Sequence, residues 1–182
     1  MTLQKIISGG QTGSDRGGLN AAIKIGIPHG GTCPQDRRAE DGVIPLKYKL
    51  KQTNSSEYPP RTTINVLDSD GTIVFTVGKP ERGSALTLSL CNKHKKPSLH
   101  IDLGIMTHPP AAQLIAQWIT REKINVLNVA GNRESVFPGI EKQVEEVLIH
   151  ALTLGGHVPF GPRNVPERKT DGGKDQDHRG KG

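Results

Sequence analysis

The fold is decided by Ile124-Asn125-Val126-Leu127-Asn128-Val129 and by the glycine-bearing turn over residues 130–139 that follows it. The quoted residues are mostly branched aliphatic, which predicts a buried strand. After the turn, apolar residues recur at helical spacing until a pair of glycines ends the pattern. These residues are Ile140, Val144, Val147, Leu148, Ala151, Gly155 and Gly156. A strand, a glycine turn and an amphipathic helix make the unit from which parallel α/β folds are built.

The same unit recurs towards the N-terminus. The predicted strands are residues 3–8, 72–77 and 98–103, and the predicted helices are residues 15–25, 83–94 and 109–119. Residues 58–68 are predicted to be a short helix or an irregular crossover, because consecutive parallel strands need one. We therefore predict an α/β, three-layer Rossmann-like fold with a mostly parallel sheet of about five strands.

The chain has 182 residues, which suits one compact domain. We expect residues 1–160 to form a Rossmann-like ligand-binding domain. Residues 161–182 contain Val165 as their only aliphatic residue and are predicted to be a disordered polar tail. Residues 30–60 are polar and longer than a structural connection requires, so this segment is either functional or mobile.

Composition excludes several classes of protein. The sequence has no apolar run of membrane-spanning length and no signal-peptide pattern, so no membrane partner is expected. Cys33 and Cys91 cannot make a disulfide framework, which favours a cytoplasmic location. The net charge of +6 favours an anionic partner, but aromatic residues are only 3% and no basic run appears. Nucleic acid is therefore not expected, and a small anionic ligand is.

Three glycine-bearing turns, residues 9–18, 78–84 and 130–139, each follow a predicted strand and precede a predicted helix. In a parallel sheet such turns share the carboxyl edge, where these folds bind ligands. Each helix N-terminus offers unpaired N–H groups and a partial positive charge, and glycine lets a phosphate approach them. The candidate binding residues are Gly10, Gln11, Thr12, Gly13, Ser14, Asp15 and Arg16 in the first turn, Gly83 and Ser84 in the second, and Gly131, Arg133, Glu134 and Ser135 in the third.

The charged candidates have different expected roles. Arg16 and Arg133 would bind an oxyanion, and Glu134 a hydroxyl or an amine of the ligand. Glu134 and Asp15 also suit a structural role, because acidic residues in a first helical turn stabilise the helix dipole. The sequence assigns no catalytic residue.

Other known sites fit the sequence poorly. The glycines of the first turn do not give G-x-G-x-x-G in register, no acidic residue follows at the distance of a ribose contact, and no G-K-[ST] is present. His29 and Cys33 have no second pair at zinc spacing, so no metal site is expected. Standard dinucleotide and P-loop binding are therefore disfavoured.

The sequence contains an ordered series of motifs, which are Gly9-Gly10-Gln11-Thr12-Gly13-Ser14-Asp15-Arg16, then Cys33-Pro34 with Arg38-Ala39-Glu40-Asp41-Gly42, then Asp68-Ser69-Asp70-Gly71-Thr72, and last Asn128-Val129-Ala130-Gly131-Asn132-Arg133-Glu134-Ser135 with Pro138-Gly139-Ile140. This series resembles the family named "putative molybdenum carrier". The resemblance implies a parallel α/β carrier of a phosphate-bearing ligand, either molybdenum cofactor (molybdopterin) or a nucleotide. It also implies a homo-oligomer.

The sequence departs from that family at three positions. Thr32, Leu67 and Asn132 stand where Trp, Arg and Pro are common. The departures at positions 32 and 67 remove a ring and a guanidinium beside the expected cleft, so they bear on the identity of the ligand.

The wider group that the motifs resemble includes phosphoribohydrolases with a G-G-x-G-T-x-x-E turn. Aligned on Gly83 and Ser84, Thr87 takes the place of that glutamate, and a hydroxyl cannot act as a carboxylate base. A binding or carrier protein is therefore predicted, with a nucleotide-processing hydrolase of the phosphoribohydrolase type as the alternative.

Overall fold

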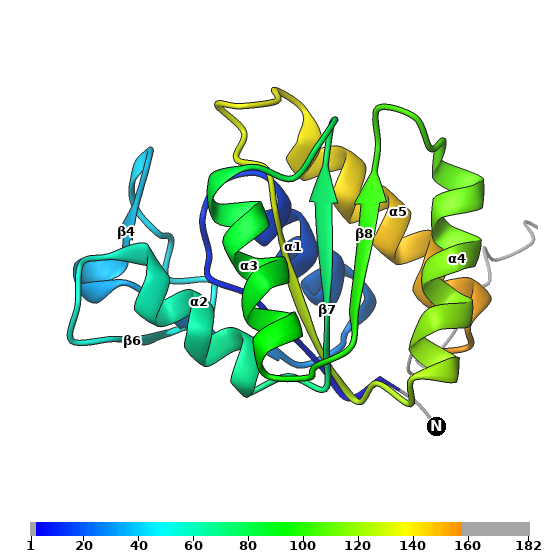
Figure 1. Cartoon of the computed structure of the whole chain (residues 1–182), viewed down its shortest axis with the longest axis horizontal. Coiled ribbons are helices and arrows are strands. Elements are labelled where there is room, and N and C mark those ends of the chain that lie inside the picture. Colours follow the sequence, from blue (N-terminus) through cyan, green and yellow to red (C-terminus); the bar gives the residue numbers. More distant parts are fainter. Residues whose placement is uncertain (1–2, 158–182) are drawn as a thin grey trace, which may run out of the picture.

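A computed structural model describes residues 3–157, so the tail predicted for residues 161–182 lies outside the described residues. Five strands form the central sheet in the order β2-β1-β9-β7-β8, and every pairing is parallel. These strands are β1 (Lys5–Ile7), β2 (His29–Gly30), β7 (Gly71–Thr76), β8 (Ser98–Asp102) and β9 (Val126–Gly131). The predicted α/β fold with a five-stranded parallel sheet is confirmed (Figure 1).

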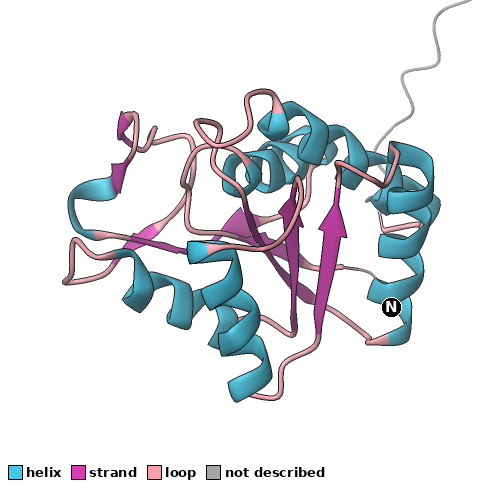
Figure 2. Cartoon of the chain, turned by 45° about the horizontal axis from the view of Figure 1, so that its top comes forward, coloured by secondary structure: helices cyan, strands magenta, loops and turns pink. Residues whose placement is uncertain are grey.

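Helices cover both faces of this sheet (Figures 1 and 2). On one face, α5 (Ile140–Leu154) packs against both α1 (Ser14–Ile25) and α4 (His108–Arg121). On the other face, α2 (Tyr58–Leu67) packs against α3 (Arg82–Lys93). The main hydrophobic core lies between the sheet and the first group, and it includes the five apolar α5 residues predicted from helical spacing. The expected crossover over residues 58–68 is α2.

The segment over residues 30–60 is an ordered substructure. β3 (Thr32–Cys33) pairs with β6 (Lys51–Gln52), and η1 (Gln35–Arg37) leads into a hairpin of β4 (Arg38–Ala39) and β5 (Gly42–Val43). Its apolar residues surround a second small core centred on Tyr48 and Ile44. The Arg37 guanidinium supports this core by donating to four backbone carbonyls, those of Ile44, Pro45, Tyr48 and Leu50.

No helix within residues 3–157 is long and apolar enough to cross a membrane.

Candidate functional site

The three glycine turns lie on neighbouring strands. β1, β9 and β7 are adjacent in the sheet, so the loops that follow them meet at one edge (Figure 2). After β1 and β9 the chain enters α1 and α5 on one face, whereas after β7 it enters α3 on the other. The chain therefore diverges between β9 and β7, which is where open parallel sheets form a ligand-binding crevice.

Asn132 joins all three turns. Its carbonyl oxygen accepts the backbone N–H of Ser14 at 3.0 Å, and its own N–H donates to the carbonyl of Phe75 at 2.9 Å. Its side-chain Oδ1 accepts the N–H of Val77, the residue directly before the second turn, at 3.1 Å. Asn132 is absent from the predicted site, because a single asparagine in a loop carries no signal of such a role.

The predicted glycines divide into two kinds. A Cβ on Gly13 (φ +77) would lie 2.5 Å from the Asn132 carbonyl oxygen, and one on Gly131 (φ +153) would lie 1.9 Å from that of Phe75. These glycines are required by the packing of loop against loop. A Cβ on Gly83 or Gly78 would meet no atom within 4 Å, so the second turn has open space beside it.

Asp15 is held by a residue that the sequence did not indicate. Its buried carboxylate accepts from the Arg61 guanidinium at 3.0 Å and from the N–H of Gln11 at 3.2 Å. Burial raises the pKa of Asp15 above its ordinary value, although the charge of Arg61 and the N–H of Gln11 oppose the shift. Arg61 comes from α2 and lies over Gly9, where a Cβ would collide with the guanidinium. The Asp15 carboxylate is therefore paired within the protein.

Arg16 is engaged by a second carboxylate. Its two terminal nitrogens donate to Asp41 at 2.6 and 2.8 Å, and its Nε donates to the Gly10 carbonyl at 3.1 Å. The hydrogen bond from Arg16 lowers the pKa of Asp41. The guanidinium predicted to bind a ligand oxyanion is thus paired within the protein.

Glu40 occupies the donors that the sequence assigned to a ligand. Its carboxylate accepts the Ser135 hydroxyl at 2.6 Å, the Ser135 N–H at 3.3 Å and the Thr12 hydroxyl. An Arg133 terminal nitrogen lies 3.6 Å away. Burial acts to raise the pKa of Glu40, but the hydrogen bonds from Ser135 and Thr12 outweigh it, and the pKa is lowered. Glu40 appears in the motif series of the sequence without a role.

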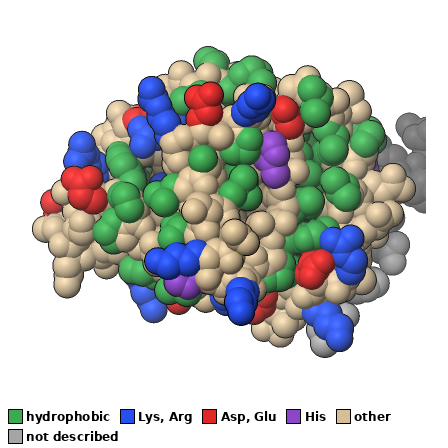
Figure 3. Space-filling model, viewed as in Figure 1, with side chains coloured by type: hydrophobic (Ala, Val, Ile, Leu, Met, Phe, Trp, Pro, Cys, Tyr) green, Lys and Arg blue, Asp and Glu red, His purple; other side chains and the backbone are tan. Residues whose placement is uncertain are grey.

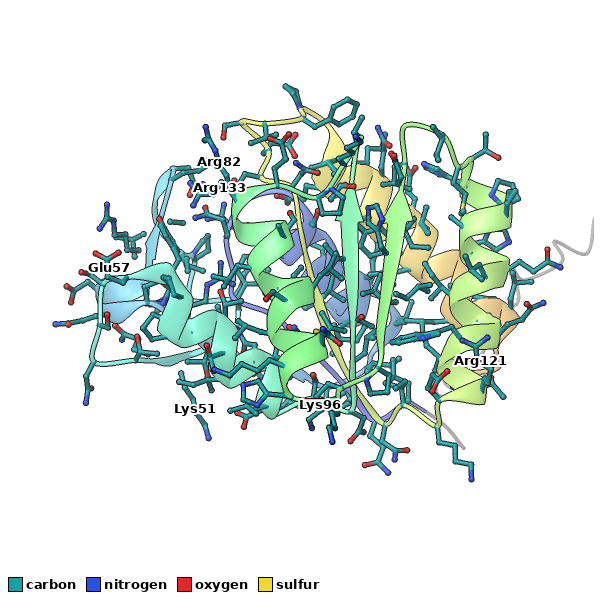
Figure 4. All side chains as sticks on the ribbon, in the orientation of Figure 1. Lys51, Glu57, Arg82, Lys96, Arg121 and Arg133 are labelled. Carbon is teal, nitrogen blue, oxygen red and sulfur yellow. The ribbon has the colours of Figure 1, made fainter. Side chains whose placement is uncertain are left out.

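Arg133 is more accessible to a ligand than Arg16, whose side chain is buried. It stacks on the ring of Tyr58, with 4.8 Å from the guanidinium carbon to the ring centroid, and its side chain is 39% exposed. Figure 4 shows Arg82 and Arg133 near the N-terminal end of α3. Arg82 has a φ of 45°, an unusual value for a residue with a side chain. The space-filling view shows basic and acidic side chains together along the top edge of the molecule (Figure 3).

Glu134 caps the last helix. Its carboxylate accepts the N–H of Gly139 and, at 3.0 Å, that of Glu141 at the start of α5. The N–H groups of Gly139 and Glu141 are therefore satisfied by the protein itself.

A cavity of about 460 Å³ lies between the hairpin and the N-terminal ends of α1 and α5. Its lining residues are Thr12, Arg16, Glu40, Asp41, Glu134, Ser135 and Glu141. The volume suits a small ligand. Within residues 3–157 no group of three or more His, Cys, Asp or Glu side chains is placed to hold a metal ion. Three of the lining carboxylates, those of Glu40, Asp41 and Glu134, instead accept hydroxyl, guanidinium or N–H donors of the predicted turns. The fourth, that of Glu141, accepts the side-chain amide of Asn20 at 3.0 Å.

The model of the circularly permutated YpsA SLOG family matches residues 6–152. The chain belongs to this family. A solved structure from Syntrophus aciditrophicus, named "Putative molybdenum carrier protein", is 46% identical and has a TM-score of 0.81; the match covers 83% of this chain and 96% of that one. The resemblance to such carriers is therefore confirmed. A comparison with curated proteins found no match.

Two departures of this SLOG family member can now be located. Asn132, in place of the common proline, supplies the N–H and Oδ1 contacts that bind the third turn to Phe75 of β7 and to Val77, which directly precedes the second turn. Leu67 is the last residue of α2 and precedes the amino end of β7, so it lies at the opposite edge of the sheet from the turns. The expectation that position 67 borders the cleft is wrong, because the crossover helix runs away from the site.

Proposed function

We propose that the protein binds and carries a small phosphate-bearing ligand at the carboxyl edge of β1, β9 and β7. The observation that supports this most is the joining of three glycine turns through Asn132. In this arrangement the hydroxyls of Thr12 and Ser135 and the guanidinium of Arg133 surround one carboxylate, that of Glu40. Hydroxyl, N–H and guanidinium groups are the donors that proteins use for phosphate.

The second turn adds an open helix N-terminus to this edge. No atom would lie within 4 Å of a Cβ on Gly83, and the partial positive charge at the start of α3 attracts an anion. Arg133 would bind a phosphate oxygen, while the half-buried ring of Tyr58 keeps the guanidinium in place. Molybdenum cofactor (molybdopterin) is our first candidate ligand, in line with the name of the similar solved structure, and a nucleotide is the second.

Hydrolysis of a nucleotide is the alternative function, and the surroundings of Thr87 argue against it. Thr87 is buried in α3 and its hydroxyl donates to the Gly83 carbonyl at 2.9 Å. Asp15, the buried carboxyl of the first turn, is paired with Arg61. We expect no free base to be released from nucleoside monophosphates, as measured by chromatography. Release by the wild-type chain would favour the hydrolase.

The binding proposal is tested by calorimetric titration with guanosine monophosphate and with inorganic pyrophosphate. Arg133→Ala should weaken binding roughly tenfold or more, since it removes a charged hydrogen-bond donor. Arg121→Ala is the matched control, because Arg121 is exposed on α4 and pairs with its neighbour Glu122 (Figure 4). Equal affinity in the two variants would exclude Arg133 from the site. Native mass spectrometry of the purified chain would identify a ligand that co-purifies.

A further inference from the structure

The β4–β5 hairpin places two consecutive carboxylates into the proposed phosphate site. Glu40 and Asp41 form the turn between Ala39 and Gly42. Glu40 accepts from Ser135 and Thr12, and Asp41 accepts both terminal nitrogens of Arg16. Each acceptor thus uses donors of the glycine turns that the sequence assigned to a ligand.

The donors around Glu40 suit an oxyanion of any kind. A backbone N–H, two hydroxyls and a guanidinium converge on its carboxylate from the first and third turns. Carboxylate and phosphate oxygens accept from the same donor types at the same distances. The group that sits there now has one negative charge, whereas a phosphate brings a larger charge and a third oxygen.

Ala39 of β4 is buried in the second small core, but the outer strand and the tip of the hairpin are lightly attached to the rest of the fold. Within residues 3–157, β4 and β5 pair only with each other; each has two residues, and they lie apart from the central sheet (Figure 1). Val43 is 72% exposed, so little apolar area holds the outer strand. A two-stranded hairpin of this size has marginal stability by itself. Its tip is therefore held mainly by the polar contacts of Glu40 and Asp41.

One more contact fastens the tip to the first turn. The backbone N–H of Glu40 donates to the Gln11 Oε1 at 3.0 Å. The Gln11 Nε2 is buried and has no hydrogen-bond partner within the described part of the chain. A buried amide nitrogen without a partner costs free energy, and an oxygen of a bound ligand would satisfy it.

We propose that Glu40 and a phosphate group of the ligand are alternative occupants of one oxyanion subsite, formed by Thr12, Ser135 and Arg133, and that the β4–β5 hairpin leaves this subsite when the phosphate binds. The inference rests on the proposed function and adds regulation to the same site. A carboxylate tethered this closely competes at an effective concentration of roughly millimolar order. The hairpin therefore selects for ligands whose phosphate outcompetes a carboxylate.

The test compares Glu40→Gln with Glu57→Gln in calorimetric titrations with inorganic pyrophosphate. Glu57 is exposed just before α2, away from Arg133, and its substitution makes the same change in charge (Figure 4). We expect Glu40→Gln to tighten binding about tenfold, which corresponds to roughly 1.4 kcal/mol, and Glu57→Gln to leave it within about twofold of wild type. Asp41→Asn frees Arg16 and loosens the hairpin, so it should tighten pyrophosphate binding by a smaller factor than Glu40→Gln.

The outcomes separate the two proposals. Suppose that the wild type binds pyrophosphate and Arg133→Ala does not, but Glu40→Gln binds no more tightly than wild type. The proposal that Glu40 and a phosphate are alternative occupants is then overturned, and the proposed function stands. If neither the wild type nor Glu40→Gln binds any phosphate probe, both are overturned.

Hydrogen exchange gives a second readout on the unaltered protein. Pyrophosphate should accelerate amide exchange in residues 39–43, because the hairpin leaves the subsite, while exchange at Ser135 slows. Increased protection of residues 39–43 would show that the ligand binds with Glu40 in place. That result would overturn the proposal that a phosphate displaces Glu40 from the subsite.

Discussion

The carbonyl oxygen of Asn132 accepts both the backbone N–H of Ser14, at 3.0 Å, and its hydroxyl, at 3.1 Å. A residue that the sequence places in a phosphate cradle thus spends its two donors inside the protein. The first turn therefore presents Thr12, rather than Ser14, to a ligand. The gain is rigidity, because α1 and the loop after β9 cannot move apart without breaking both bonds.

Removing the Asn132 side chain should loosen the second turn alone. Asn132→Ala keeps the backbone contacts to Ser14 and Phe75 but leaves the N–H of Val77 without its acceptor. We expect the free energy of unfolding in urea to fall by about 1–2 kcal/mol, the cost of an unsatisfied, partly buried donor. Asn92→Ala, on the exposed side of α3, is the control and should change it by less than about 0.5 kcal/mol.

Two glycine substitutions separate structure from ligand approach. Gly131→Ala places a Cβ 1.9 Å from the Phe75 carbonyl oxygen at a φ of +153°, so we expect a loss of about 3 kcal/mol in thermal or urea unfolding. Gly83→Ala meets no atom within 4 Å and lies in a helix, so stability should be unchanged or rise by up to about 1 kcal/mol. Gly83→Ala should nevertheless weaken pyrophosphate binding, because its methyl group lies where the phosphate approaches α3. Unchanged affinity would place the ligand away from α3.

Acid should release the hairpin. The pKa values of Glu40 and Asp41 are lowered in the fold, so their contribution to stability is present above the unfolded pKa values and is lost as the pH falls through the folded ones. The difference in unfolding free energy between wild type and the Glu40→Gln/Asp41→Asn double variant should be full above about pH 5 and shrink below about pH 4. Asp15, whose raised pKa acts with the opposite sign, is present in both chains and cancels. A difference that is constant down to about pH 3 would contradict the assignment.

Local pattern was enough to predict most of the fold, because the long strands and helices carry their own periodicity. It did not indicate β2, since His29–Gly30 is too short to show a pattern and is a strand only through its pairing with β1. On α3 the buried side includes Ser84 and Thr87, two polar residues that no apolar pattern marks, while Leu86 and Leu90 are half-buried.

Local sequence pattern predicted even less of the candidate site. The turns of Thr12, Arg133 and Ser135 were found because glycine between a strand and a helix has local meaning. The residues that engage them come from segments distant in the chain, such as Arg61 on α2 and Glu40 on the hairpin. No local pattern announces such a contact, because only the tertiary fold brings a carboxylate of the 30–60 segment to a loop near residue 135.

The Tyr58 ring supports the guanidinium of Arg133 in the site. The guanidinium carbon lies 4.8 Å from the ring centroid, and a cation over an aromatic face is worth about 0.5–1 kcal/mol at an exposed site. Tyr58→Leu should therefore weaken pyrophosphate binding by roughly twofold to fivefold, since Arg133 then samples other rotamers, while Tyr58→Phe retains the ring and the affinity. Calorimetric titrations of both Tyr58 variants with pyrophosphate test this expectation. The double variant Arg133→Ala/Tyr58→Leu completes a double-mutant cycle with the two single variants. If Tyr58 acts only through Arg133, the double variant binds no more weakly than Arg133→Ala. A further loss would mean that the ring contacts the ligand itself.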